Sequence, residues 1–177
     1  MQAGGRSTFL FARIVVVFGL LLVSYYAFAA TELYQTRIFQ PYVEINAYLS
    51  GGILSLFGYQ MTAGASSLSS PEFSLSIGKG CDGLEPTAFF VAAVLAFTAP
   101  LVLKLPALAI GVPLLVSVNL VRIVSLFLVG IYYPDLFHTM HVDVWQVLYI
   151  LVGIAFFGLW LMWATRSRAP SGAAAGD

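Results

Sequence analysis

Long runs of apolar residues, interrupted by very few charges, constrain this chain more than any other feature of its sequence. A helix needs about 20 mostly apolar residues to cross the hydrocarbon core of a bilayer. Four stretches are long enough, and they cover residues 9–30, 84–103, 107–132 and 142–164. Charged residues make up only 9% of the chain, whereas soluble domains contain about 25%. The sequence therefore predicts an all-α polytopic membrane protein with about four transmembrane helices.

The remaining composition argues against several other classes of protein. The chain has 177 residues and no net charge, which favours a single integral membrane domain over residues 1–168 and argues against a nucleic-acid-binding surface. Its single cysteine rules out an internal disulfide framework, and no Cys/His spacing typical of a zinc site occurs. We therefore expect neither a metal ion nor an organic cofactor. Residues 169–177 are expected to form a disordered tail.

The distribution of basic residues predicts the orientation in the membrane. Both termini, and a turn expected at Lys104-Leu105-Pro106 between the second and third spans, carry most of the arginine and lysine residues. Cytoplasmic segments are enriched in these residues, so we expect both termini to be cytoplasmic and Cys81 and His141 to lie at the outer face. The first span ends in Ala27-Phe28-Ala29, which also resembles a signal-peptide cleavage site. Because its apolar run is long, we expect it to be retained as an anchor.

The segment between the first two spans, Thr31–Lys79, is too polar to cross the membrane and too apolar to be disordered. Apolar residues from Leu33 to Leu56 recur at near-helical spacing, which predicts an amphipathic helical segment on the outer face. We expect Gly51-Gly52 and Gly58 to interrupt this helix.

A small β-hairpin is predicted after that helix. In Ser66–Gly78, apolar residues alternate with serines, which is typical of a strand with one buried face. Ser70-Pro71-Glu72 can form the turn. The hairpin then leads the chain directly to Cys81.

Cys81 stands in Gly80-Cys81-Asp82-Gly83, immediately before the second apolar run. Free cysteines are usually small buried hydrophobic residues, but that interpretation fits a cysteine inside an apolar run better than one on a glycine-rich turn. A helix N-terminus or a nearby cation lowers the pKa of a thiol, whereas Asp82 and Glu85 raise it. A thiolate here would need a cation such as Arg122. Residue chemistry alone leaves a functional and a structural role for Cys81 equally open.

Arg122 interrupts the third apolar run, with Asn119 one helical turn away. A charged side chain in the middle of a membrane-spanning helix costs about 2.5–3.5 kcal/mol on insertion scales. A structural explanation is a partner such as Asp82, Glu85 or a backbone carbonyl. A functional explanation is that a guanidinium keeps its charge and presents several N–H donors to a substrate or a thiolate. We favour the functional explanation and expect Asn119 to orient Arg122.

Two histidines precede the last apolar run. His141 stands at its start, whereas His138 lies in Tyr133–Met140, which we expect to be a loop. Either imidazole can supply acid–base chemistry near neutral pH, although a lone loop histidine is usually an exposed polar residue. We favour His141, because the helix that follows holds it in one position. Trp145, one turn further on, is expected to pack against its ring.

Three motifs, Cys81-Asp82-Gly83-Leu84, Asn119-Leu120-Val121-Arg122-Ile123 and His141, together resemble the exosortase/archaeosortase family. In that family a cysteine opens a membrane helix on the outer face, an N-x-x-R motif lies in a later helix, and a histidine precedes the next one. The resemblance covers about residues 48–164, and the compact chain with its sequence from His141 to Gln146 is most similar to the short exosortase H type. Asp82 departs from the serine that many relatives carry, and the extra spans and C-terminal domain of longer exosortases have no counterpart.

The resemblance implies a cysteine peptidase and transpeptidase of the bacterial inner membrane, with its active site on the outer (periplasmic) face. Members are taken to cleave a C-terminal sorting signal of exported proteins, made of a short motif, an apolar helix and a basic tail. The new carboxyl end then passes to a surface acceptor, which is lipid- or glycan-linked. Cys81 is the implied nucleophile that forms a thioester, Arg122 stabilises the thiolate or oxyanion, and His141 is the acid–base residue. The candidates for substrate contacts are Glu85, Asn119 and Trp145.

An alternative function belongs to a different class. The chain would be a non-enzymatic membrane subunit of an export or transport assembly, in which Arg122 and Glu85 form a buried ion pair. The two hypotheses differ in whether Cys81 is needed, because only an acyl-transfer enzyme requires the thiol.

Overall fold

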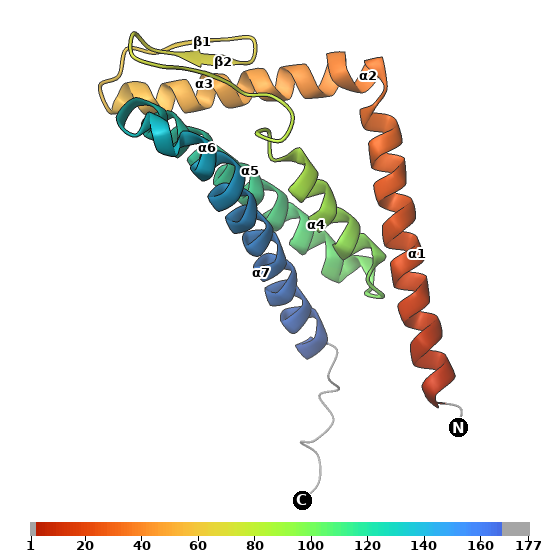
Figure 1. The fold of residues 1–177 in the computed structure, drawn as a ribbon. Coiled ribbons are helices and arrows are strands. Elements are labelled where there is room, and N and C mark those ends of the chain that lie inside the picture. Colours follow the sequence, from red (N-terminus) through yellow and green to blue (C-terminus); the bar gives the residue numbers. More distant parts are fainter. Residues whose placement is uncertain (1–2, 168–177) are drawn as a thin grey trace, which may run out of the picture.

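The computed structural model describes residues 3–167, and the predicted tail at 169–177 lies outside them. Four helices run lengthwise through the molecule, and a fifth, α3 (Gln40–Leu56), lies across one end with a small sheet (Figure 1). The lengthwise helices are α1 (Ala3–Ala29), α4 (Leu84–Ala96), α5 (Leu101–Tyr132) and α7 (Trp145–Arg166). α1 begins and α7 ends at the end opposite α3 (Figure 1), as an arrangement with both termini on one side of a membrane requires.

Three helical segments are long and apolar enough to cross a membrane, which confirms the polytopic membrane fold. They are Thr8–Ala29, Leu101–Tyr132 and Pro134–Arg166. The last segment begins earlier than the predicted start at residue 142. Short helical turns at η2 (Pro134–Leu136), α6 (Phe137–Thr139) and η3 (Met140–Val144) continue into α7. The prediction of a loop over Tyr133–Met140 is therefore wrong.

The second predicted span, 84–103, is divided in the structure. α4 has 13 residues, which at about 1.5 Å per residue is about 20 Å, shorter than the hydrocarbon core of a bilayer. The chain then turns at residues 97–100, where Pro100 has extended backbone angles and precedes the first turn of α5. A proline disfavours helix in the residue before it and cannot donate a backbone hydrogen bond. Pro100 therefore prevents α4 from continuing into α5.

Lys104-Leu105-Pro106 is not the predicted turn but part of α5. Lys104 is 9% exposed, and its ammonium group donates a hydrogen bond to the Leu95 carbonyl near the end of α4. A cation at a helix C-terminus satisfies an unpaired carbonyl and favours the negative end of the helix dipole. Lys104 is therefore a capping residue between two helices.

The segment after α1 is helical, as predicted. α2 (Glu32–Tyr34) and the π-helical turn η1 (Gln35–Phe39) lead into α3. Gly51 and Gly52 do not interrupt α3, contrary to the prediction. A Cβ atom on Gly51 would lie 3.2 Å from side-chain atoms of Ala63 and Leu68, so this glycine allows the sheet to pack closely on the helix. Gly58, with φ +91°, follows the helix end, as is common after a C-cap.

The predicted hairpin is present as β2 (Ser67–Ser69) and β3 (Ser74–Ser76), in antiparallel register with Leu68 opposite Leu75. The Ser70 hydroxyl accepts hydrogen bonds from the backbone N–H groups of Glu72 and Phe73 in the turn. A third strand, β1 (Thr62–Gly64), pairs with β2 and was not predicted. Both leucines are buried, so the hairpin contributes one apolar face to the core.

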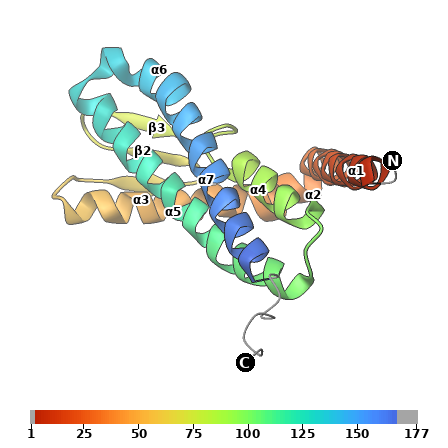
Figure 2. The same cartoon turned by 90° about the horizontal axis from the view of Figure 1, so that it is seen from below.

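Two clusters of buried residues hold the molecule together. The first joins α3, the sheet and the second half of α5, and it contains Val43, Leu68, Ile77, Cys81, Ile123 and Phe127. The second joins α4, α5 and α7. Viewed from the end, α4 lies between α1 and the crossing pair of α5 and α7 (Figure 2). Cys81 thus belongs to the rigid layer that covers the ends of the membrane helices.

Candidate active site

Cys81 lies on a turn that is held by the carboxylate of the next residue. Asp82 Oδ2 accepts a hydrogen bond from the Gly80 N–H at 3.1 Å, and Oδ1 accepts one from the Leu84 N–H at 2.7 Å. Asp82 is 3% exposed. Its negative charge therefore fixes the turn and the first residue of α4, which explains why an acid is tolerated beside the cysteine.

Side chains from four helices hold the backbone carbonyls of this turn. The Asp82 carbonyl accepts hydrogen bonds from the Tyr42 hydroxyl at 3.0 Å and the Asn119 amide at 2.9 Å. The Gly83 carbonyl accepts from the Thr87 hydroxyl at 2.7 Å, and the Tyr149 hydroxyl, which donates to the Leu115 carbonyl at 2.8 Å, lies 3.5 Å from it. Because α3, α4, α5 and α7 all contribute, the position of Cys81 is coupled to the packing of most of the molecule.

The thiol faces an imidazole. Cys81 Sγ lies 3.2 Å from His141 Nδ1 and 3.4 Å from Nε2. The turn before α4 and the π-helical turn η3 are 60 residues apart in the chain and meet here. A proton can pass between sulfur and nitrogen at this distance, which is the geometry of a nucleophile with its base.

His141 is fixed by a neighbour that sequence reasoning missed. The Phe137 ring stacks on the imidazole, with centroids 5.8 Å apart and planes at 26°. The predicted neighbour, Trp145, packs against the first core cluster. His138 is exposed and lies on α6, not in a loop. Phe137 precedes His141 by one helical turn, so the helix that continues into α7 presents both rings on one face.

Arg122 is almost fully buried, at 2% exposure. One of its terminal nitrogens donates to the His141 carbonyl at 3.5 Å, and its Nε has no hydrogen-bond partner among the described residues. Within that part of the chain, Arg122 forms no ion pair with Asp82 or Glu85, and its partner is a backbone carbonyl, one of the structural partners that the sequence left open. A buried guanidinium without a counter-ion favours any negative charge that develops beside it.

The expected role of Asn119 also changes. Its amide nitrogen holds the Asp82 carbonyl, and its side chain is fully buried. Asn119 therefore positions the cysteine turn, whereas we expected it to orient Arg122.

The sequence did not predict the roles of Tyr42, Thr87 and Tyr149. Nothing in their local sequence distinguishes them from ordinary helix residues. The partners of Tyr42 and Tyr149 are 40 and 66 positions away and depend on the tertiary fold, whereas Thr87 donates to the carbonyl four positions before it.

The surroundings of the Cys81 thiol favour its protonated form. Burial raises the pKa of Cys81 above its ordinary value, the positive charge of Arg122 lowers it, and the negative charge of Asp82 raises it. Burial is the largest of these effects. A thiolate is therefore disfavoured even with Arg122 nearby, and the sulfur would need a base to act as a nucleophile.

Alkylation of Cys81 should show this raised pKa directly. The rate with iodoacetamide follows the thiolate fraction, so we expect it to rise with pH through a midpoint above that of a free cysteine, about 8.5. Quenching the reaction at successive times and weighing the protein by mass spectrometry gives the alkylation rate at each pH. If the midpoint lay below that of a small-molecule thiol, the positive charge of Arg122 would lower the pKa of Cys81 more than burial raises it. Burial would then not be the dominant cause.

Gly83 is expected to tolerate no side chain. Its φ of +75° costs an L-residue about 1–2 kcal/mol, and a Cβ atom would lie 2.8 Å from both the Asn119 side chain and the Tyr149 hydroxyl. Gly80 is a matched control, because its φ is +88° but a Cβ atom there meets nothing within 4 Å. We expect Gly83→Ala to lower the thermal unfolding midpoint in detergent more than Gly80→Ala. Equal midpoints would show that the carbonyl contacts do not constrain the turn.

Comparison with known proteins supports a single family. A family model described as transmembrane exosortase (Exosortase_EpsH) matches residues 3–166. No curated protein and no solved structure matches the chain. The match includes the cysteine turn, the buried arginine and the histidine that faces the thiol. The chain therefore belongs to the transmembrane exosortase family.

Proposed function

We propose that this protein is a cysteine transpeptidase that cleaves a C-terminal sorting signal from exported proteins. The signal consists of a short motif, an apolar helix and a basic tail. A lipid- or glycan-linked group at the cell surface then accepts the new carboxyl end. The observation that carries the proposal is the 3.2 Å contact between the only thiol and an imidazole, beside a buried arginine.

The first chemical step follows from this contact. As the Cys81 sulfur attacks the scissile carbonyl carbon, its proton moves to a ring nitrogen of His141 and the carbonyl oxygen becomes an oxyanion. Arg122 stabilises that negative charge in a poorly hydrated site. When the carbon–nitrogen bond breaks, the imidazolium gives its proton to the leaving amine, and a thioester to Cys81 remains.

The second step reverses the first with a different nucleophile. His141 takes a proton from the acceptor, which attacks the thioester carbonyl, and the sulfur leaves and regains the proton. Both protons are thus returned, and no oxidant or reductant is consumed.

Co-expression with a tailed reporter, an exported protein that ends in such a signal, tests the proposal. We expect the reporter to lose its apolar helix and basic tail, and mass spectrometry to find one new carboxyl end or an acceptor attached to it. An intact reporter across a panel of tailed candidates would favour the non-enzymatic assembly subunit.

The side of the membrane is tested separately. We propose that the cysteine turn lies at the periplasmic face of a bacterial inner membrane, because the basic residues concentrate at the opposite end. A membrane-impermeant maleimide added to intact spheroplasts should label Cys81 at the rate seen after permeabilisation. Labelling that requires permeabilisation would invert the orientation.

A further inference from the structure

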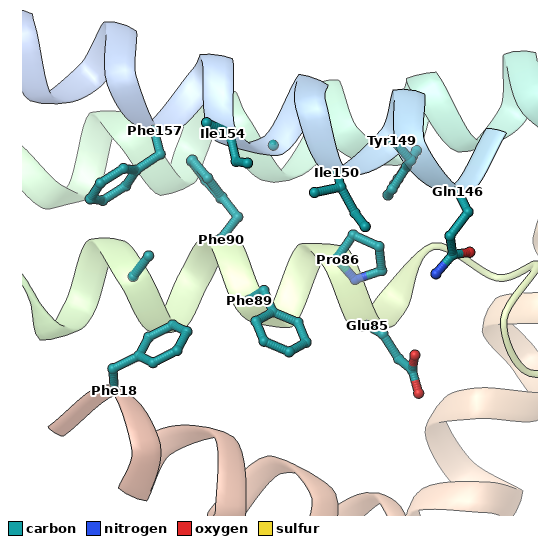
Figure 3. Close-up of a pocket in the computed structure, with 12 residues that line it drawn as sticks. Phe18, Glu85, Pro86, Phe89, Phe90, Gln146, Tyr149, Ile150, Ile154 and Phe157 are labelled. Atoms are coloured by element: carbon teal, nitrogen blue, oxygen red, sulfur yellow. The ribbon is translucent and has the colours of Figure 1, made fainter. Parts of the chain in front are cut away.

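An apolar groove runs along α4 between α1 and α7 (Figure 3). Its volume is about 390 Å³, and its apolar lining includes Phe18, Phe89, Phe90, Ile150, Ile154 and Phe157. Ile154 is 62% exposed and Phe89 is 43% exposed, although both are large hydrophobic residues on membrane helices. The groove therefore presents an uncovered apolar surface at the depth of the lipid chains.

The groove is bordered by α1, which packs on α4 rather than on α5 or α7. None of the most apolar window of α1 is buried, and its main neighbour is α4. Phe18 of α1 contacts Phe89 of α4 at a centroid distance of 6.1 Å. A molecule within the bilayer can thus reach α4 between α1 and α7 without crossing the layer formed by α3 and the sheet.

The groove adjoins a further pocket beside the cysteine turn. Glu85 and Gln146 lie at one end of the groove, opposite Phe18 and Phe157 (Figure 3). Glu85 also lines a second pocket of about 210 Å³, whose polar lining residues include Gln35, Lys79 and Asp82. Asp82 is the neighbour of Cys81. The apolar groove and the second pocket therefore share one exposed carboxylate, that of Glu85.

We propose that this groove binds the apolar helix of the sorting signal, while the second pocket receives the residues that precede that helix. This inference rests on the proposed function and names where that substrate docks. A polypeptide with an apolar helix and a polar flank matches both parts. A phospholipid also has an apolar chain and a polar head, so cross-linking has to distinguish it from the reporter helix. Gly153 and Ala93 line the groove with small side chains, and small residues allow helices to approach closely.

The geometry also limits where the substrate is cut. Four Cα–Cα steps of about 3.8 Å separate Cys81 from Glu85, so these Cα atoms are at most about 15 Å apart. An extended chain covers about 3.3–3.6 Å per residue, so about four or five residues bridge that distance. The scissile bond should therefore lie within about five residues of the start of the apolar helix.

Gly153 allows the groove to be filled without disturbing the protein. A Cβ atom on Gly153 meets nothing within 4 Å, and the same is true of Gly158 on the same helix, which does not line the groove. We expect Gly153→Leu to slow reporter cleavage by about tenfold or more and Gly158→Leu to leave it near the wild-type rate. Iodoacetamide should alkylate Cys81 equally fast in both variants, which shows that the turn is intact. Equal cleavage by the two variants would refute the docking site.

Cross-linking tests the occupant without relying on cleavage. A photo-reactive residue is placed at Ile154, in the groove, or at Leu151, which is 56% exposed on α7 but outside it. The background is Cys81→Ala, so that the reporter stays uncut. We expect the reporter helix to cross-link from position 154 and not from 151. Adducts only with lipid or with a second copy of this chain, or equal adducts from both positions, would overturn the assignment.

Failure of the inference differs from failure of the proposed function. A wild-type enzyme that leaves every tailed reporter intact would refute the function, and the docking site with it. A wild-type enzyme that cuts the reporter more than about ten residues from its apolar helix would refute the docking site alone.

Discussion

Replacing His141 with alanine is expected to lower the rate of reporter cleavage by about 10²–10⁴-fold, the usual contribution of general acid–base catalysis. The reason is that burial raises the pKa of the Cys81 thiol, and His141 is the base within 3.2 Å of its sulfur. His138→Ala is the matched control, because that histidine is exposed one turn earlier on the same helical segment. Quantitative blotting of the reporter at equal enzyme expression measures both.

The outcome for the two histidines decides the assignment. If His138→Ala stops cleavage while His141→Ala does not, the acid–base residue is wrongly assigned. If both variants process normally, the thiol finds its base elsewhere and the stacked Phe137–His141 pair is only structural.

Arg122→Ala is expected to lower cleavage by about 10²–10³-fold, as loss of an oxyanion donor does in other acyl-transfer enzymes. The variant should still insert in the membrane, because removing a buried charge lowers the cost of insertion. Arg122→Lys should also lose most activity, since one ammonium group does not reproduce a planar guanidinium with several donors. Single-turnover kinetics of the purified variants separate this effect from weaker substrate binding.

Two controls make the arginine result specific. Arg37→Ala removes an exposed arginine from η1 and should leave cleavage unchanged. The alkylation midpoint of Cys81 should rise further in Arg122→Ala, because the positive charge of Arg122 lowers the pKa of the thiol. Near-normal cleavage by Arg122→Ala would leave Arg122 without a role in the chemistry, and an unchanged midpoint would show that its charge does not influence the thiol.

The membrane fold was predictable from the sequence because it depends on the length of apolar runs. The bounds of α4 and α5 were not. Lys104-Leu105-Pro106 has the composition of a turn, but Lys104 donates to the end of α4 from inside α5, and the turn forms at Pro100. The alternating serines predicted the β2–β3 hairpin, whereas β1 has no such alternation and forms only because β2 is there to pair with it.

For the candidate site, sequence reasoning named three side chains that the structure brings together and missed those that hold them. Cys81, Arg122 and His141 stand out because a thiol on a glycine turn, a charge in an apolar run and an imidazole at a helix start are each unusual locally. Tyr42 and Tyr149 are ordinary residues in amphipathic or apolar helices, and their contacts with the cysteine turn exist only in the folded chain.

The short α4 has a consequence for the mechanism. Its 13 residues end in the turn at residues 97–100, so α1, α5 and α7 carry most of the membrane-spanning length. The N-terminus of α4 presents the cysteine turn, and its length contributes the floor of the apolar groove. One short helix thus links the nucleophile to the surface that we propose for the substrate helix.

The central claim is that Cys81 becomes acylated, and mapping that thioester tests it most directly. Membranes from cells that express the enzyme with a tailed reporter are denatured in acid and digested, and the Cys81 peptide is weighed by mass spectrometry with and without neutral hydroxylamine. We predict a reporter-derived adduct on Cys81 that hydroxylamine removes and that Cys81→Ala lacks. Processing of the reporter by Cys81→Ala at the wild-type rate would contradict the account.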